Sequence, residues 1–501
     1  MEDSLRRLRP RLSVLLALAA MACCAHAGPL QDAERELFAA RYKNAARMYA
    51  AILKANPAES EAFSGLVRAL IKDHRSGEAY AAAADALGKN PHTTGAQTAA
   101  GMAAFRRGEI GKAGEYFRAA LQLDPAYAAA LAGLASVERS LSRFKSAHDL
   151  LLAAYRSSPG DPQLMIERAN ELKGEERVSA LQEALTILDP ASQEAVSLRA
   201  RIADDRVIGD RQLRRLTNPY VGSKIKLFPG QNYLGVMVQL NGHEVKLKLD
   251  SGAPGLNLSS AAASRAELET LGSLGVPALG VGGGRSPSAT LRLASQVRIG
   301  DLVFADYPVH VLGLAQLPDP DTDGYIGTDM FAAFLVTIDF PKLELSLAPY
   351  PDEGRDPESA GPRDAAAETP AGFYRVYRFG HFLAVPTSIN GGRDTLFLID
   401  CGAANNNMDS SVGHEFAKVR GGGGFVVRGI DGSVKVSRAD GVSLAFAGFR
   451  KAGLSLLVLS YEGLSDKTGA GLGGVIGFRL LKEMVLTIDY RQGAVRFEHP
   501  K

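Results

Sequence analysis

Two aspartates with matched neighbours are the side chains best suited to chemistry in this sequence. Asp250 opens Asp-Ser-Gly-Ala at residues 250–253, and Asp400 opens Asp-Cys-Gly-Ala at residues 400–403. Two carboxylates held close together can share one proton, so that one acts as a general base and the other as a general acid. A single Asp-Ser-Gly is ordinary turn sequence, because all three residue types favour turns. The pairing is what makes these aspartates candidate catalytic residues.

The interval of 150 residues between the aspartates recurs in two further motifs. Tyr-Ile-Gly at 325–327 returns as Val-Ile-Gly at 475–477, and Thr-Ile-Asp-Phe at 337–340 returns as Thr-Ile-Asp-Tyr at 487–490. Alternating apolar and polar runs surround Asn241-Gly242 in the first copy and Asn390-Gly391 in the second, and this pattern predicts β-hairpins. The second half of the chain is therefore a tandem duplication of one unit of strands. Each copy carries its aspartate at a turn that follows a strand.

The hairpin, the Asp-Ser-Gly-Ala turn, the apolar-apolar-Gly motif and the Thr-Ile-Asp strand together resemble the retropepsin-type aspartyl proteases. The resemblance covers residues 223–348 and again 373–499, and it implies a covalently joined pseudo-dimer with a cleft between two all-β lobes. It also implies an endopeptidase without a cofactor, in which Asp250 and Asp400 activate a water molecule against a peptide or protein substrate. Whether the lobes pair within one chain or exchange between two chains is left open.

Four residues beside the aspartates are expected to support the site. Gly252 and Gly402 allow the two turns to approach closely where a side chain would interfere. Ser251 is expected to hydrogen-bond across the pseudo-dyad, whereas Cys401 should do so poorly because a thiol is a weak donor. The resemblance places the two substrate-covering flaps around Gly282 and Gly283 in the first lobe and around Asp431 and Gly432 in the second.

Three departures from the family pattern support a second hypothesis. Cys401 replaces the usual Ser or Thr, Pro254 follows the first turn, and Asn405-Asn406-Asn407 crowds the second turn. These changes are compatible with a non-catalytic peptide-binding or assembly protein on a degenerate aspartic-protease fold.

The first part of the chain carries a repeat of 34 residues. Prolines recur at Pro57, Pro91, Pro125 and Pro159, and alanines keep the same interval from Ala45 to Ala147. Asn-Pro or Asp-Pro ends a helix, and small residues allow paired helices to cross closely. This pattern resembles tetratricopeptide repeats and predicts an α-helical solenoid over residues 28–215. It implies a concave surface for a protein or peptide partner, or a scaffold that only positions the second half.

Two segments are expected to lie outside the folded domains. Residues 1–27 combine a basic head, a short apolar run and Ala25-His26-Ala27, which is typical of a secretory signal. The protein is therefore expected to be exported to the periplasm or secreted, with a lipid anchor at Cys23 the less favoured alternative, and no mature segment is expected to cross a membrane. Residues 349–372 are rich in Pro, Ala and acidic residues, which predicts an exposed linker between the lobes.

Charge and composition argue against other classes of function. Removing residues 1–27 leaves equal numbers of acidic and basic side chains, so the electrostatic signature of a nucleic-acid-binding protein is missing. The histidines include no His-Glu-x-x-His and no paired Cys/His spacing, so no metal site is expected. The sequence predicts a multidomain protein with a helical repeat array followed by a bilobal all-β domain.

Overall fold

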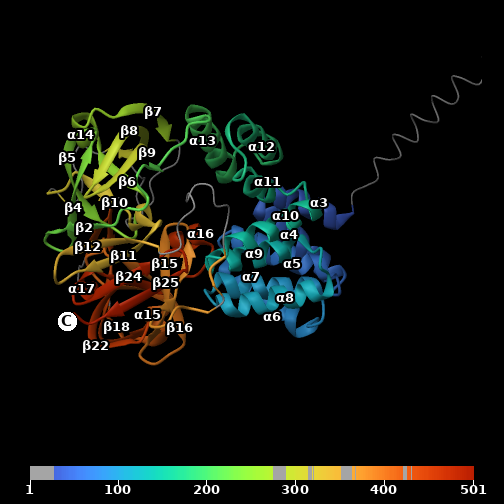
Figure 1. Cartoon of the computed structure of the whole chain (residues 1–501). Coiled ribbons are helices and arrows are strands. Elements are labelled where there is room, and N and C mark those ends of the chain that lie inside the picture. The colour runs from blue at the N-terminus through green and yellow to red at the C-terminus, as the bar shows by residue number, and fades with distance from the viewer. Residues whose placement is uncertain are drawn as a thin grey trace, which may run out of the picture.

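The computed structural model describes residues 28–274, 289–313, 319, 321–350, 364–366, 368–420, 426–429 and 432–500. Figure 1 shows a helical half beside a β half that carries the C-terminus. The expected signal, residues 1–27, lies outside the described residues. Within these ranges, no helix has the length and apolar character needed to cross a membrane.

The N-terminal half is a run of consecutive helices whose turns keep the 34-residue interval. These are α3 (Pro29–Phe38), α4 (Tyr42–Ala55), α5 (Ser60–Lys72), α6 (Ser76–Lys89), α7 (Thr94–Arg106), α8 (Ile110–Leu123), α9 (Ala128–Ser140), α10 (Phe144–Ser157), α11 (Pro162–Ala169), α12 (Gly174–Ile187) and α13 (Gln193–Ile208). Ala40, His74, Gly108 and Ser142 connect successive helices with φ between 58° and 78°. This left-handed backbone costs least for glycine, so the repeat persists in the backbone where the sequence has lost its glycine.

The helical array curls until its first and last helices touch. The amide of Asp189, between α12 and α13, donates to the carbonyl of Ala39 at 2.9 Å. The Tyr42 hydroxyl donates to Glu194 of α13 at 2.6 Å, and Arg68 of α5 pairs with Asp161 at 2.6 Å. The concave side therefore surrounds a cavity of about 960 Å³.

The first lobe is a β-barrel in which β5 and β10 carry the first aspartate turn. Its elements are β1 (Arg215–Leu216), β3 (Phe228–Pro229), β4 (Leu234–Leu240), β5 (His243–Leu249), β6 (Leu256–Ser259), α14 (Ser260–Arg265), β7 (Glu269–Leu274), β8 (Ala289–Ile299), β9 (Leu302–Leu312), β10 (Gly324–Ile326) and the 3-10 helix η1 (Thr328–Phe331). Pairing of β8 with β9 closes the order β9-β6-β10-β5-β4-β8 into a ring. Asn241 and Gly242 turn the β4–β5 hairpin with φ of 51° and 87°, which confirms the predicted hairpin. The last helix of the array, α13, ends at Ile208, and Arg215 already pairs with β9.

The second lobe repeats this barrel. Its elements are β14 (Tyr377–Phe379), β15 (Phe382–Ile389), β16 (Asp394–Asp400), β17 (Asn407–Asp409), α15 (Ser410–Phe416), β18 (Val419–Arg420), β19 (Val426–Gly429), β20 (Gly432–Lys435), β21 (Ser437–Phe446), β22 (Phe449–Leu459), α16 (Glu462–Thr468), β23 (Gly474–Gly477) and α17 (Phe478–Leu481). Its ring runs β15-β16-β23-β17-β22-β21 and closes through the pairing of β15 with β21. The predicted all-β, bilobal architecture is confirmed.

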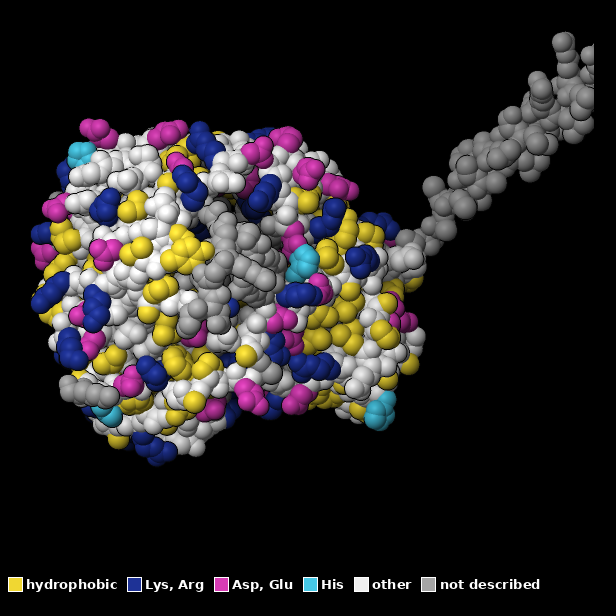
Figure 2. Space-filling view, in the orientation of Figure 1, with side chains coloured by type: hydrophobic (Ala, Val, Ile, Leu, Met, Phe, Trp, Pro, Cys, Tyr) yellow, Lys and Arg dark blue, Asp and Glu magenta, His cyan; other side chains and the backbone are white. Residues whose placement is uncertain are grey.

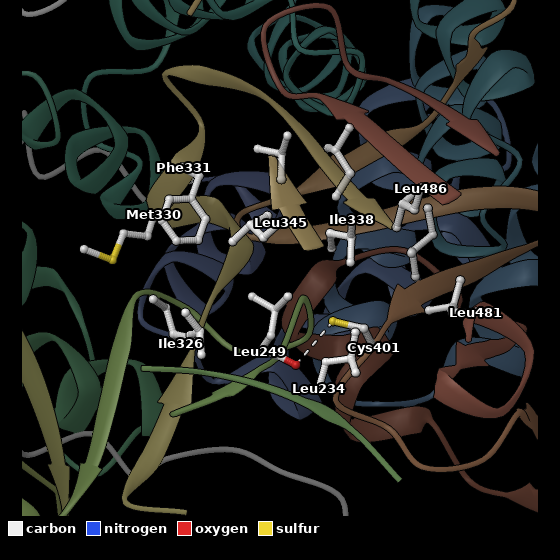
Figure 3. Packing of buried hydrophobic residues seen from close by; sticks show 14 of the residues in the cluster. Leu234, Leu249, Ile326, Met330, Phe331, Ile338, Leu345, Cys401, Leu481 and Leu486 are labelled. Carbon is white, nitrogen blue, oxygen red and sulfur yellow. Dashed lines mark hydrogen bonds between the residues drawn. The ribbon is translucent and has the colours of Figure 1, made fainter. Parts of the chain in front are cut away.

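A shared sheet joins the two lobes beneath the aspartates. It has the order β13-β25-β24-β11-β12-β2, formed by β13 (Tyr374–Arg375), β25 (Ala494–Glu498), β24 (Val485–Asp489), β11 (Phe334–Asp339), β12 (Glu344–Pro349) and β2 (Ser223–Lys226). At its centre Thr337 pairs with Thr487, and their hydroxyls lie 3.2 Å apart. The two copies therefore meet at equivalent residues within one chain. Figure 3 shows Ile338 and Leu486 of this sheet in the same apolar cluster as Leu249 and Cys401.

The helical array rests against the second lobe. Asp466 of α16 forms an ion pair with Arg106 of α7, and its carboxyl group lies 2.7 Å from His74 Nδ1. Phe117 of α8 belongs to an apolar cluster that also contains Leu396 of β16. The array and the second lobe therefore share both an apolar core and an ion pair whose arginine is buried.

Most of the described residues between the lobes are exposed or half-exposed, and a few of them contact the helical array and the second lobe. Asp364 accepts hydrogen bonds from the amide and hydroxyl of Ser146, at the start of α10, and Ala365 is buried. The amide of Ala366 donates to Gln492 at 2.8 Å. Composition alone missed these contacts because they depend on where the array lies.

Candidate active site

Asp250 and Asp400 lie at equivalent turns, one at the end of β5 and one at the end of β16. The register pairs β5 with β10 and β16 with β23 in parallel, so each turn lies beside an apolar-apolar-Gly motif. Asp250 Oδ1 accepts from the Gly252 amide at 2.8 Å, and Asp400 Oδ1 accepts from the Gly402 and Ala403 amides at 2.9 Å. Each carboxyl group lies against the glycine that follows the other, close enough for each to change the pKa of its partner. The structure thus brings together the two aspartates selected from the sequence.

The glycines after each aspartate lie against the carboxyl group of the other lobe. A Cβ on Gly252 would lie 2.7 Å from Asp400 Cγ, and a Cβ on Gly402 would lie 2.1 Å from Asp250 Cγ. Both distances are shorter than a van der Waals contact between carbon atoms. Any side chain at either position would push the two carboxyl groups out of line.

Ser251 and Cys401 brace the two turns reciprocally. The Ser251 hydroxyl donates to the Ile399 carbonyl at 2.8 Å and accepts from the Cys401 amide at 3.0 Å. The Cys401 thiol donates to the Leu249 carbonyl at 3.3 Å and accepts from the Ser251 amide at 3.4 Å. Figure 3 shows the thiol of Cys401 directed at the Leu249 carbonyl. The thiol makes the same two contacts as the hydroxyl, at the longer distances that sulfur requires.

Burial and mutual repulsion set the protonation of the pair. Burial, followed by the negative charge of Asp400, raises the pKa of Asp250. Burial also raises the pKa of Asp400, against the hydrogen bond from the Ala403 amide, which lowers it. Two adjacent carboxylates cannot both ionise easily, as in the aspartic-protease pair that serves as a standard example of this effect. The arrangement therefore favours one proton shared between the two carboxyl groups.

Two residues near the aspartates were not predicted from the sequence. Lys248 lies two residues before Asp250 on β5, and its ammonium bonds to Asp319 at 2.9 Å. His381, immediately before β15, has its Nε2 3.2 Å from the Gly252 carbonyl. Strand alternation contained a signal for Lys248, since residues two apart share a face. His381 had no local signal, because its contact crosses between the lobes.

The other departures from the family pattern have structural explanations. Asn406 is buried, and its side-chain oxygen accepts from the Gly477 amide at 2.9 Å. The equivalent amide in the first lobe, that of Gly327, donates to the Gly255 carbonyl at 2.7 Å instead. The Pro254 carbonyl accepts from the Asn257 amide group at 2.7 Å. These residues stabilise the turns and leave both carboxyl groups in place.

Of the residues predicted to form the two flaps, the structure describes only one, in the second lobe. Gly282, Gly283 and Asp431 lie outside the described residues, whereas Gly432 pairs with Gly429 at the end of the β19–β20 hairpin. The predicted position of a second-lobe hairpin therefore coincides with a real hairpin. Among the residues that the structure describes, no group of three His, Cys, Asp or Glu side chains is placed to hold a metal ion.

Comparisons with known proteins address the first lobe most directly. Residues 236–330 match the family model described as Aspartyl protease, a range that runs from β4 to η1 and includes Asp250. The chain is similar to a solved aspartic proteinase from Irpex lacteus with 11% identity and a TM-score of 0.35, covering 56% of this chain and 98% of that one. No curated protein is significantly similar in sequence. The sequence similarity to aspartyl proteases is therefore located in the first lobe, around Asp250.

Proposed function

We propose that this protein is an aspartic endopeptidase that hydrolyses peptide bonds with a water molecule bound between Asp250 and Asp400. The observation that supports it most strongly is the close approach of two buried carboxyl groups, one from each lobe, held by equivalent turns. The hydrogen bonds of Ser251 and Cys401 to carbonyl groups of the opposite lobe hold these turns in place. Mutual bracing of this kind supplies the preorganised geometry that acid–base catalysis requires.

In the proposed cycle, the pair of carboxyl groups carries one proton at the start and one proton at the end. The ionised carboxylate takes a proton from water as the water oxygen attacks the peptide carbonyl carbon, and the protonated carboxyl gives its proton to the carbonyl oxygen. The pair then holds one proton on the opposite aspartate. When the C–N bond breaks, that proton passes to the leaving nitrogen, and the ionised aspartate takes a proton from a hydroxyl of the intermediate. The pair ends as it began.

The proposal predicts that each aspartate is indispensable. Asp250→Asn and Asp400→Asn remove the shared proton and should each lower peptide hydrolysis by roughly 100- to 10,000-fold. Cleavage of a peptide library between pH 3 and 8 measures the effect. Asp339→Asn is the matched control, because Asp339 accepts from the Lys342 amide at a strand end, a bond that asparagine retains. Cleavage that survives either dyad substitution would refute the mechanism.

We also propose that the cavity of the helical array docks an extended segment of the substrate. Its lining combines apolar side chains such as Leu37 and Met102 with charged ones such as Arg68 and Lys72. Figure 2 shows hydrophobic side chains gathered on the helical half, over the region of α5, α7 and α9. His381 lines this cavity and also contacts the Gly252 carbonyl. Docking there would bring a peptide close to the active-site turn.

The alternative function, peptide binding without cleavage, is favoured by the cavity but not by the aspartate turns. It predicts that a bound peptide remains intact with the unaltered chain as well as with Asp250→Asn. Mass spectrometry of peptides recovered after binding separates the two functions.

A further inference from the structure

A buried charge lies beside the two aspartates on one lobe only. Lys248 precedes Asp250 by two residues in β5, so both side chains leave the same face of the strand, about 7 Å apart along it. The Lys248 side chain is 10% exposed. Leu247 and Leu249, which alternate with it, belong to the barrel core. A lysine is thus directed to the side of the sheet that carries the catalytic carboxyl group.

The ammonium of Lys248 is fixed by three neighbours. It bonds to Asp319 Oδ2 at 2.9 Å, and it lies 5.4 Å from the Tyr233 ring centre and 5.7 Å from that of Tyr325. Tyr325 is also its partner in the parallel pairing of β5 with β10. Although burial opposes the charge, the attraction of Asp250, Asp319 and Asp400 raises the pKa of Lys248. The ammonium therefore stays charged beside the pair.

The second lobe has no such cation at the equivalent positions. The residues 150 positions beyond Lys248 and Tyr325 are Leu398 and Val475, both buried in the apolar cluster that joins the second lobe to the helical array. The duplication preserved the aspartates and glycines, whereas the lysine is particular to the first lobe. Core packing alone does not require this difference, because a leucine fills the same position in the other barrel.

The remaining titratable groups around the pair are uncharged at mildly acidic pH. These are the side chains of Tyr233, Tyr325, Cys401, Tyr461 and His381. Burial raises the pKa of the three tyrosines and of the thiol, and burial followed by Lys467 lowers the pKa of His381 to about 4. Among the described residues, Lys248 is the cation that acts on both aspartates, and Asp319 acts on Lys248. Further charged groups lie beside the uncharged neighbours: Lys467 and Arg378 act on His381, Asp321 acts on Tyr233, and Asp409 acts on Tyr461.

We propose that Lys248 is a positioning residue that keeps the Asp250–Asp400 pair singly ionised, with Asp319 balancing its charge. This inference rests on the proposed peptidase function. A fixed cation favours each ionisation of the pair, and the partial neutralisation by Asp319 limits that effect. The charge balance of the cluster thereby sets the pH range in which one carboxyl is protonated and the other is not.

Opposite shifts of the pH profile test the proposal. Lys248→Met removes the cation, so both limbs of the profile of kcat/KM should move up by roughly one pH unit. Asp319→Asn removes the negative charge that balances Lys248, so both limbs of the profile should move to lower pH. Lys248→Arg keeps the charge and should restore the original profile. Lys246→Met is the matched control, because Lys246 lies on the same strand face but is exposed, and its profile should not move.

A second readout separates this inference from the peptidase proposal. Carbon-13 NMR titration of labelled aspartate carboxyl groups, with Asp250→Asn to assign the pair, follows ionisation without any cleavage. If Lys248→Met raises the titration midpoints while no variant cleaves peptides, Lys248 does control the ionisation of the pair and the peptidase proposal fails. If Lys248→Met cleaves with an unshifted profile and unshifted midpoints, the inference is wrong and the peptidase proposal stands.

Discussion

Cys401 occupies the position of Ser251 in the other lobe, and the two side chains brace the turns with different atoms. Each donates to a carbonyl of the opposite lobe and accepts from an amide of the opposite turn. A thiol is a weaker donor and acceptor than a hydroxyl, so the two halves of this brace should differ in strength. Burial raises the pKa of the Cys401 thiol to about 12, which keeps it protonated and able to donate.

Truncating each bracing residue should reveal this difference. Ser251→Ala leaves the Cys401 amide and the Ile399 carbonyl buried without that partner, which should cost about 2 kcal/mol in the free energy of unfolding. Cys401→Ala should cost less, because it removes weaker bonds. Urea denaturation monitored by the β-sheet signal measures both, with Cys401→Ser as the control that retains the bonds. Equal losses for the two alanine variants would contradict the assigned strengths.

At the scale of the elements, the turns after β5 and β16 depend on the absence of two side chains. Gly402→Ala should lower hydrolysis at least about 100-fold, because its Cβ must displace the Asp250 carboxyl group and such misplacements are costly in catalysis. Gly463→Ala in α16 is the control, because nothing lies within 4 Å of its added Cβ. Peptide cleavage rates and a melting curve for each variant check the prediction. Unchanged cleavage by Gly402→Ala would show that the carboxyl groups do not work in this arrangement.

Regular elements and the paired turns could be predicted from sequence, because their signals are local and repeat at fixed intervals. The 34-residue interval predicted pairs of helices, and Asn241-Gly242 predicted the β4–β5 hairpin, and both are present. The role proposed for Lys248 could not be predicted, because it depends on a contact with Asp319, which is 71 residues away in the sequence. Likewise His381 reaches Gly252 only through the approach of the two lobes. Contacts of this kind arise from the assembled fold and leave no periodic pattern.

Across the whole molecule, the helical array and the second lobe form one continuous structure. Arg106 is buried, and it bonds to Asp466 and to the Ser76 hydroxyl. The rim of the cavity includes residues 378–382 and 466–469 of the second lobe. Because the array and the β domain are fixed in this way, a peptide in the cavity would have a defined position relative to the active-site turn.

Filling the cavity should therefore weaken the cleavage of long substrates and spare short ones. Ser136 is exposed on α9 and lines the cavity, so Ser136→Trp would occupy the space without disturbing a packed core. KM for an unfolded protein substrate should rise roughly tenfold, which corresponds to about 1.4 kcal/mol of lost docking energy. For a short peptide that spans only the aspartates, kcat/KM should stay unchanged, because it does not reach the array. Ser179→Trp on α12 is the matched control, exposed but outside the cavity lining. An equal effect on both substrates, or none on the protein substrate, would mean that the array serves only as a scaffold.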